Sequence, residues 1–386
     1  MRALPAAVLV ALFLPASWAE VDAGHSYRGR AAVLLANARI ELVVLKNGGA
    51  FPSLTLADDD EGTNPMWDSF RADREQGRPE RSGGGVGHFV CADGFGPTSA
   101  EERAAGLEGH GEAHRLEWTT EFAGQSEGAD VLRQSVTLPR VREVLRREVR
   151  LLPGENVVYV RSSLISLLDF DRPINWAEHA TIGSPFLERG VTVVDMSRNR
   201  ALTRPREGSS RAGLAHRLVG GEEFKWPMAP LRAGGLVDLR AAPEESHSLD
   251  HTGHLMDPDS EWAFVTALHP VKRLLLGYLF RTSEFPWLQT WESYPRDRLM
   301  ARGLEFGTQA FDLSRREVVT EGRKFGALLY RWLPARSEIR GAYLMFWTRT
   351  PEGFLGVDEA VWHDGVIRIR DSRSGQSIEL PARGTL

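Results

Sequence analysis

Cysteine is nearly absent from this chain of 386 residues, which contains only Cys91. An internal disulfide, a cysteine-based zinc motif and a redox pair all need at least two cysteines, so all three are excluded. A chain of this length can bury a core large enough to fold without such crosslinks. Cys91 stands between apolar residues in "GHFVCADG", and we expect it to be a buried small side chain.

Blocks of basic residues are also missing, and the net charge at pH 7 is −5. We therefore expect no nucleic-acid partner. Beyond residue 19 the sequence has no run of eighteen uncharged apolar residues, so we expect no membrane-spanning helix after it. Internal repeats are absent as well, which argues against a repeat architecture.

The first 19 residues have the pattern of a secretory signal peptide. Arg2 precedes an apolar run that ends at Pro15, and the small residues Ser17 and Ala19 occupy the positions expected before a cleavage site. We expect cleavage after Ala19 and a secreted or periplasmic mature protein. The alternative interpretation is a buried first strand or helix.

What the remaining sequence does contain is many short β-type segments separated by turn-sized gaps. Examples are "ARIELVVL" (38–45), "RLEWTTEF" (115–122), "VLRQSVTL" (131–138) and "NVVYVRSSLISL" (156–167). The turn "LPGEN" before the last of these predicts a hairpin. More than a dozen such segments predict an all-β fold with two large packed antiparallel sheets and few helices.

The domain organisation follows from the same pattern. We expect a polar lead-in at 20–35 and a single β-sandwich domain at 36–386, because no linker-like change in composition occurs later. Two charged, Gly-rich stretches, 71–85 and 197–213, are expected to be surface loops.

The stretch "GHGEAH" (109–114) concentrates candidate functional side chains. His110, Glu112 and His114 are spaced two apart and would share one face of a strand. They could hold a metal, form an inert polar face, or bind a polar organic ligand. Ligands of a metal must converge on one point, which three successive residues of one strand face do not do, so the sequence favours the organic ligand and no metal. The spacing H-x-E also begins the zinc deaminase motif, but the cysteine pair that this motif requires is missing.

Two later segments supply carboxylates and another imidazole. "NWAEHATIGSPFL" (175–187) contains Glu178 and His179, and "GLEFGTQAF" (303–311) contains Glu305 in an apolar strand. If Glu305 points inward, desolvation raises its pKa and makes it a candidate general base; an outward orientation would be inert. Trp291 could offer its ring to a sugar or belong to the core.

A further group of histidines lies in "HSLDHTGH" (247–254). His247, His251 and His254 could form a metal cluster, but the Ser- and Asp-rich setting is more typical of a loop with exposed histidines.

Taken together, "NGGAFPSLTL", "HGEA…W", "EHATIGSPFL" and "GLEFGTQAF" resemble, in order and spacing, the galactose mutarotase (aldose 1-epimerase) superfamily. The resemblance covers residues 36–345. It implies a large antiparallel β-sandwich and an isomerase that interconverts sugar anomers by acid and base catalysis, with no cofactor and no metal. The partner implied is a monosaccharide or oligosaccharide.

The resemblance also implies roles for individual residues. His179 corresponds to the general acid and Glu305 to the general base, while His110 corresponds to the substrate-binding histidine. Glu112 would bind sugar hydroxyls or orient His110, and Trp291 would stack on the ring. The aromatic residue and Asn that follow the family's central His are replaced here by "ATIGSPF", and the family's early Arg has no counterpart.

Two alternatives belong to other functional classes. The protein could be a non-catalytic carbohydrate-binding protein that keeps the cleft. It could also be a polysaccharide lyase or hydrolase on the same fold, for which Glu112 and Glu305 are the candidate acid pair.

Overall fold

Alternating burial explains why many segments of this chain form strands. In a computed structural model that describes residues 20–75, 77, 85–205 and 213–386, strand β10 (Val157–Ser166) alternates between buried and half-buried positions along its second half. The predicted hairpin at "LPGEN" is confirmed, because β9 (Glu143–Leu151) pairs antiparallel with β10 across it. The expected signal segment, residues 1–19, lies outside the described residues.

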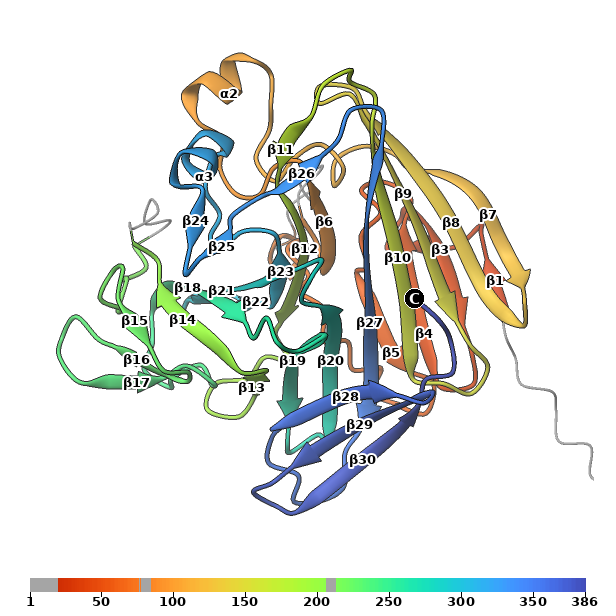
Figure 1. Ribbon diagram of the computed structural model, residues 1–386. Coiled ribbons are helices and arrows are strands. Elements are labelled where there is room, and N and C mark those ends of the chain that lie inside the picture. The colour runs from red at the N-terminus through yellow and green to blue at the C-terminus, as the bar shows by residue number, and fades with distance from the viewer. Residues whose placement is uncertain (1–19, 76, 78–84, 206–212) are drawn as a thin grey trace, which may run out of the picture.

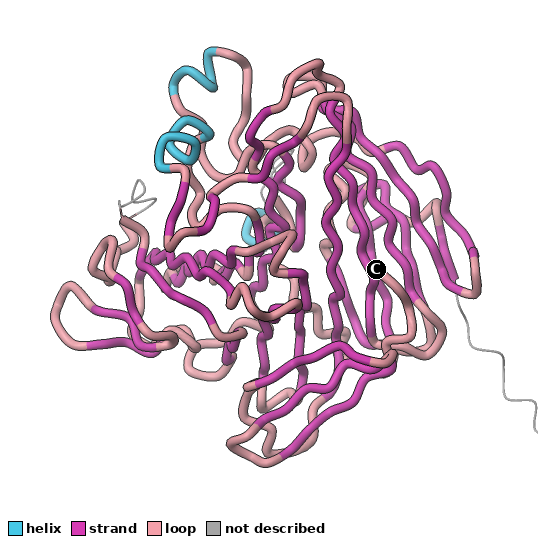
Figure 2. Tube along the Cα trace, in the orientation of Figure 1, coloured by secondary structure: helices cyan, strands magenta, loops and turns pink. Residues whose placement is uncertain are grey.

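Two eight-stranded antiparallel sheets form the sandwich, as predicted (Figures 1 and 2). The first, which we call the long sheet, has the order β13-β19-β20-β27-β10-β9-β8-β7. Besides β9 and β10 it comprises β7 (Thr119–Ser126), β8 (Ala129–Leu138), β13 (Val193–Met196), β19 (Trp262–His269), β20 (Leu274–Arg281) and β27 (Glu338–Arg349).

The second sheet, which we call the site sheet, has the order β15-β14-β18-β21-β22-β12-β23, with β6 paired to β12. Its strands are β6 (His88–Ala92), β12 (Trp176–Gly183), β14 (Asn199–Thr203), β15 (Glu223–Phe224), β18 (Ser248–Met256), β21 (Trp287–Tyr294), β22 (Ala301–Gly303) and β23 (Glu305–Gly307).

Residues 20–35, expected as a lead-in, carry strands of a third sheet. This sheet has the order β1-β3-β4-β5, with β2 paired to β3, and is formed by β1 (Glu20–Asp22), β2 (Ser26–Tyr27), β3 (Arg30–Ala36), β4 (Ile40–Leu45) and β5 (Ser53–Leu56). Val33 and Leu35 of β3 are fully buried in the main core. Their burial explains why this segment joins the sandwich.

The remaining elements are small. They are the helices α1 (Arg71–Glu75), α2 (Ala100–Ala104) and α3 (Arg315–Glu321), and the strand pairs β11 (Arg172–Ile174) with β26 (Arg331–Leu333), β16 (Met228–Pro230) with β17 (Leu236–Asp238), and β24 (Arg323–Lys324) with β25 (Ala327–Leu328). The stretches 71–85 and 197–213 are therefore not loops throughout, because α1 and β14 fall within them.

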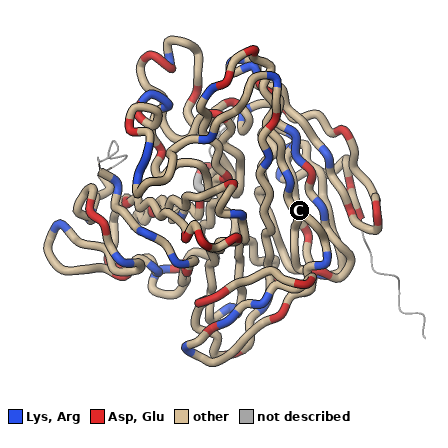
Figure 3. Tube along the Cα trace, viewed as in Figure 1, with Lys and Arg blue, Asp and Glu red and all other residues tan. Residues whose placement is uncertain are grey.

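A three-stranded sheet at the C-terminal end, β28 (Glu359–His363), β29 (Val366–Asp371) and β30 (Gln376–Pro381), lies beside the long sheet (Figure 1). Its residues Ile367 and Ile369 belong to an apolar cluster with Leu275 and Phe346 of the long sheet. Basic and acidic positions are interspersed over β7–β10 and over β28–β30 (Figure 3).

A cluster of charged and polar side chains lies in the interior and connects the two large sheets. Arg147 of β9 donates from Nη2 to both carboxylate oxygens of Glu178 on β12, at 2.9 Å each, and from Nε to Ser162 at 3.1 Å. The Nε2 atom of His88 lies 3.0 Å from the same carboxylate. Burial alone would raise the pKa of Glu178, but the Arg147 charge and the His88 hydrogen bond outweigh it and hold that pKa below its usual value.

Candidate active site

His179 and Glu305, 126 positions apart in the chain, meet on the site sheet. Strands β12 and β23 are neighbours, with Glu178 opposite Phe306. The Nε2 atom of His179 lies 3.2 Å from Oε1 of Glu305, and the two residues are 7% and 2% exposed. Glu305 therefore points inward, toward an imidazole.

Each member of this pair is oriented by a neighbour on the same face of the sheet. Gln289 stands opposite Glu305 in the register of β21 and β23, and its Nε2 donates to Oε2 of Glu305 at 2.9 Å. Thr181, two residues after His179, places its hydroxyl 2.9 Å from Nδ1 of that ring. The sequence interpretation missed both, although the two-residue spacing from His179 to Thr181, and from Gln289 to Trp291, is a signal for a shared strand face.

Aromatic and imidazole rings close over His179. Phe89 of β6 stacks on the His179 ring, with the ring centroids 4.2 Å apart, and the His110 ring centroid lies 5.2 Å away. His114 lies 6.1 Å from His110 by the same measure, and Cys91 Sγ is 3.5 Å from His110 Nδ1. As predicted, Cys91 is buried. The structure thus brings His110 and His114 to His179.

This setting shifts the protonation of the pair. Burial, followed by the charge of Asp312, raises the pKa of Glu305 well above its usual value, although the Gln289 hydrogen bond opposes the shift. Burial, followed by the neighbouring His110, lowers the pKa of His179 well below its usual value. Burial also lowers the pKa of His114 to about 3. The pair therefore favours one proton held between its two members.

Glu112 does not join this group, contrary to the expected shared strand face. Residues 109–116 form turns, β7 starts only at Thr119, and His110 has a φ of 63°. The Glu112 carboxylate accepts the backbone N–H of Arg140 at 3.0 Å and of Val141 at 3.3 Å. It holds the β8–β9 turn, so neither the expected sugar contact of Glu112 nor its pairing with Glu305 for hydrolysis is supported.

Trp291 lies on the site face of β21, two residues from Gln289. It is half-buried, and its ring meets that of Trp67 edge-on with centroids 5.7 Å apart. His251 of β18 stands directly opposite Trp291.

The expected exposed loop at 247–254 is a buried strand instead. Residues from Ser248 onward belong to β18, where His251 and His254 are 8% and 0% exposed. The Nδ1 atom of His254 lies 3.0 Å from the side-chain oxygen of Asn199, and His247 Nδ1 accepts the backbone N–H of Arg296 at 3.1 Å. The pairing of β18 with β14 on one side and β21 on the other overrides the loop-like composition.

Two features are absent from the described part of the chain. No three His, Cys, Asp or Glu side chains in 20–75, 77, 85–205 and 213–386 are grouped so that they could hold a metal ion. Over the same residues, no helix has both the length and the apolar character needed to cross a membrane.

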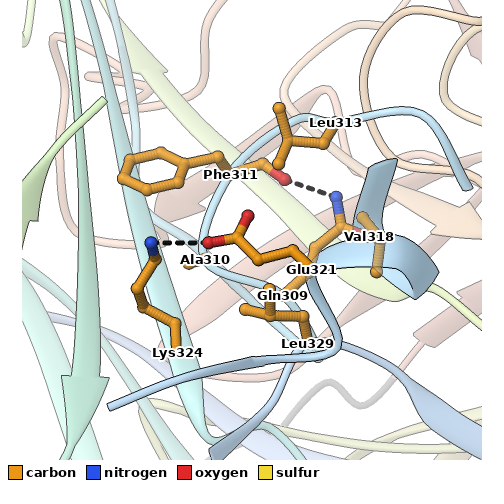
Figure 4. Close-up of a pocket in the computed structure, with 8 residues that line it drawn as sticks. All are labelled: Gln309, Ala310, Phe311, Leu313, Val318, Glu321, Lys324 and Leu329. Carbon is orange, nitrogen blue, oxygen red and sulfur yellow. Dashed lines mark hydrogen bonds and ion pairs between the residues drawn. The ribbon is translucent and has the colours of Figure 1, made fainter. Parts of the chain in front are cut away.

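A hollow too small for a water molecule lies behind the loop that follows Glu305, and few polar groups line it (Figure 4). Phe311, Leu313, Val318 and Leu329 make it largely apolar. Gln309 donates to the carbonyl of Phe311, and Lys324 pairs with Glu321 at 2.5 Å. These contacts fix the loop against α3, and that loop in turn covers Gly253 of β18.

Comparison with known proteins places this arrangement in a recognisable fold. No protein-family model matches the sequence, and a comparison with curated proteins gives no match. Among solved structures, a galactose mutarotase-like protein from Clostridium acetobutylicum matches with a TM-score of 0.57 and 14% identity, over 86% of this chain and 99% of that one.

Two further solved structures match this chain to a similar extent. A galactose mutarotase related enzyme from Lactobacillus acidophilus has a TM-score of 0.55 and 15% identity, over 83% of this chain and 99% of its own. A galactose mutarotase-like protein from Lactobacillus casei has a TM-score of 0.55 and 13% identity, over 82% and 100%. The resemblance predicted from the sequence is confirmed for the architecture: this chain has the galactose mutarotase-like fold.

Proposed function

We propose that this protein is an aldose 1-epimerase-like enzyme that interconverts the anomers of a sugar. The contact of 3.2 Å between His179 Nε2 and Glu305 Oε1, in a buried setting, carries the proposal. The fold that the chain shares with mutarotase-like structures supports it. The reaction needs one base and one acid close together, because the two oxygens that exchange protons are bonded to the same carbon.

In the proposed reaction, the proton shared by the pair first moves from Glu305 to His179; Glu305 then removes the proton of the anomeric hydroxyl while His179 protonates the ring oxygen. The C1–O5 bond breaks and an aldehyde forms. Rotation of the aldehyde and reversal of both proton transfers give the other anomer, with each proton returned. Gln289 would hold Glu305 in place, and His110 with Trp291 would contact the sugar. Positioned proton-transfer groups typically contribute about 10²–10⁴-fold each.

Anomer interconversion, followed by polarimetry or exchange NMR across a panel of aldoses, tests the proposal. A rate above the buffer control for at least one sugar would support it. Saturable binding with no such rate would instead indicate a non-catalytic carbohydrate-binding protein.

The rate should be flat over a broad pH range and fall on both sides. The active state has one proton on the pair, and that state is bounded below by the lowered pKa of His179 and above by the raised pKa of Glu305. Acid adds a second proton and removes the base; alkali removes the last proton and with it the acid. A pH profile of kcat/KM, corrected for hydroxide catalysis, measures this. A rate that keeps rising with pH would contradict a shared proton.

Replacing Gly303 with Ala should displace the catalytic carboxylate. A Cβ atom at position 303 would come within 2.1 Å of Oε1 of Glu305. A shift of about 1 Å in a reacting group costs about 10²-fold in rate, so we expect a loss of that order in kcat. Gly124→Ala in β7 is the matched control, because its added Cβ meets its nearest atom at an ordinary 3.5 Å. Equal rates for the two variants would show that Glu305 can move without consequence.

A further inference from the structure

A second hollow, with room for about one water molecule, lies at the edge of the site sheet. Arg204, His216, Arg232, Asp250 and His251 contribute to its lining. It forms where β14 ends and the segment 214–218 runs beside β18. The backbone N–H of Arg204 donates to the carbonyl of His251 at 3.1 Å, which fixes one wall against the strand.

One lining residue of the hollow, His251, is on the same face of the sheet as the catalytic pair, whereas the adjacent Asp250 faces the other side of the strand. His251 stands opposite Trp291, and Gln289, two residues from Trp291, stands opposite Glu305. With about 4.8 Å between neighbouring strands and about 3.3 Å per residue, the Cα atoms of His251 and Glu305 are roughly 12 Å apart. A saccharide that places C1 at Glu305 can therefore extend over Trp291 toward the hollow.

Some polar atoms around the hollow have hydrogen-bond or ion-pair partners, and others make no hydrogen bond. The carboxylate of Asp250 accepts the backbone N–H of Arg217 at 2.8 Å and its Nε at 2.6 Å. Arg204 Nη2 pairs with Asp312 at 3.0 Å. These two carboxylates are thus already engaged.

Two nitrogens of the lining residues make no hydrogen bond. Among the described residues, Nε of Arg204 and Nε2 of His216 are buried without one. The guanidinium nitrogen can only donate, and an imidazole nitrogen donates when it carries the hydrogen. Buried donors of this kind are normally satisfied, so the hollow suits an occupant that brings acceptor oxygens.

Resting on the function proposed above, we propose that the substrate is an acidic saccharide that places one oxygen of its anionic group in this hollow. Oxygens of a carboxylate, sulfate or phosphate would accept from the Arg204 guanidinium and the His216 imidazole. Such a charged group would gain a charge-assisted hydrogen bond from the guanidinium. A hydroxyl oxygen of a neutral sugar could also accept from these donors, but its hydrogen bond would be weaker because the acceptor carries no charge.

Binding can be measured independently of turnover. By calorimetry, the full chain is titrated with D-glucose, D-glucuronate, D-glucose 6-sulfate, D-glucose 6-phosphate and a disaccharide that carries glucuronate at its non-reducing end. We expect at least one acidic probe to bind about tenfold or more tightly than D-glucose, consistent with one or two charge-assisted hydrogen bonds. Which probe binds best identifies the acid and its distance from C1.

Two variants test whether His216 causes the preference for the acidic probe. His216→Phe keeps a planar ring but removes both nitrogens, so it should abolish the preference for the acidic probe and leave D-glucose binding unchanged. His363→Phe, at an exposed histidine of β28, should behave as wild type. NMR of histidine side chains labelled with ¹⁵N should show the His216 resonances shifting with the acidic probe.

The outcomes separate the two proposals. Equal affinities for acidic and neutral probes, or a full preference retained by His216→Phe, would overturn the acidic subsite even if anomers interconvert. Tight binding of an acidic probe through His216 without any interconversion would uphold the subsite and overturn the enzymatic function.

Discussion

Replacing Glu305 with Gln is expected to slow anomer interconversion by about 10²–10⁴-fold, the contribution typical of one positioned base. The amide has nearly the shape of the carboxyl group and can stay beside Gln289, but it cannot accept the anomeric proton. His179→Asn should cause a loss of similar size, since it removes the acid. Because the two residues act on one proton pathway, the double variant should lose little more than either single variant. Exchange NMR on the sugar found to be active measures all three.

The free energy of unfolding of the same variants is the control for this experiment. Burial raises the pKa of Glu305, so above its ordinary value the folded state retains a proton that the unfolded chain releases, and stability falls as pH rises through that interval. Glu305→Gln removes this penalty and should raise the unfolding free energy at pH 7 by about 1 kcal/mol. Glu379→Gln, at an exposed residue of β30, should change neither property. A Glu305→Gln variant with full activity would contradict the assignment of the base.

Replacing Arg147 with Met is expected to destabilise the fold by about 3–5 kcal/mol, because it leaves the fully buried Glu178 without its cation. Burial lowers the pKa of His88, so that residue stays neutral and cannot replace the lost charge. Urea unfolding at pH 7 measures the difference.

Two further variants test the cause. Arg133→Met removes a partly exposed pair with Glu148 on β8 and β9, and should cost less than about 1 kcal/mol. Adding Glu178→Leu to Arg147→Met should recover much of the lost stability, since no unpaired charge remains. A loss no larger than that of Arg133→Met would show that the interior pair contributes little.

The sheets of this protein could be predicted because alternation of apolar and polar residues is a local property. The hairpin at "LPGEN" and the β-rich composition were sufficient for the fold class. Residues 20–35 and 247–254 were misjudged, because the burial of Leu35 depends on packing in the main core and that of His251 on pairing with β21, a strand distant in the sequence. Composition within a short window does not contain that information.

The candidate site was predictable in part for a related reason. His179 and Glu305 stand in apolar strands, where a titratable side chain is conspicuous. Glu112 looked equally conspicuous, yet His110 adopts a left-handed backbone conformation and the stretch turns, so its side chains do not alternate as in a strand. Gln289 was overlooked because an amide in a strand has no distinctive local signal, and its role depends on the register of β21 with β23.

Adjacent residues of β12 serve opposite sides of the site sheet, since Glu178 faces the interior and His179 faces the pair with Glu305. A single residue inserted at the start of this strand would exchange the two orientations, placing an anion next to Glu305 and an imidazole against Arg147. Insertion tolerance along the chain should therefore reach a minimum between Trp176 and Thr181, and homologous proteins of different length should differ in their loops while β12 keeps its length.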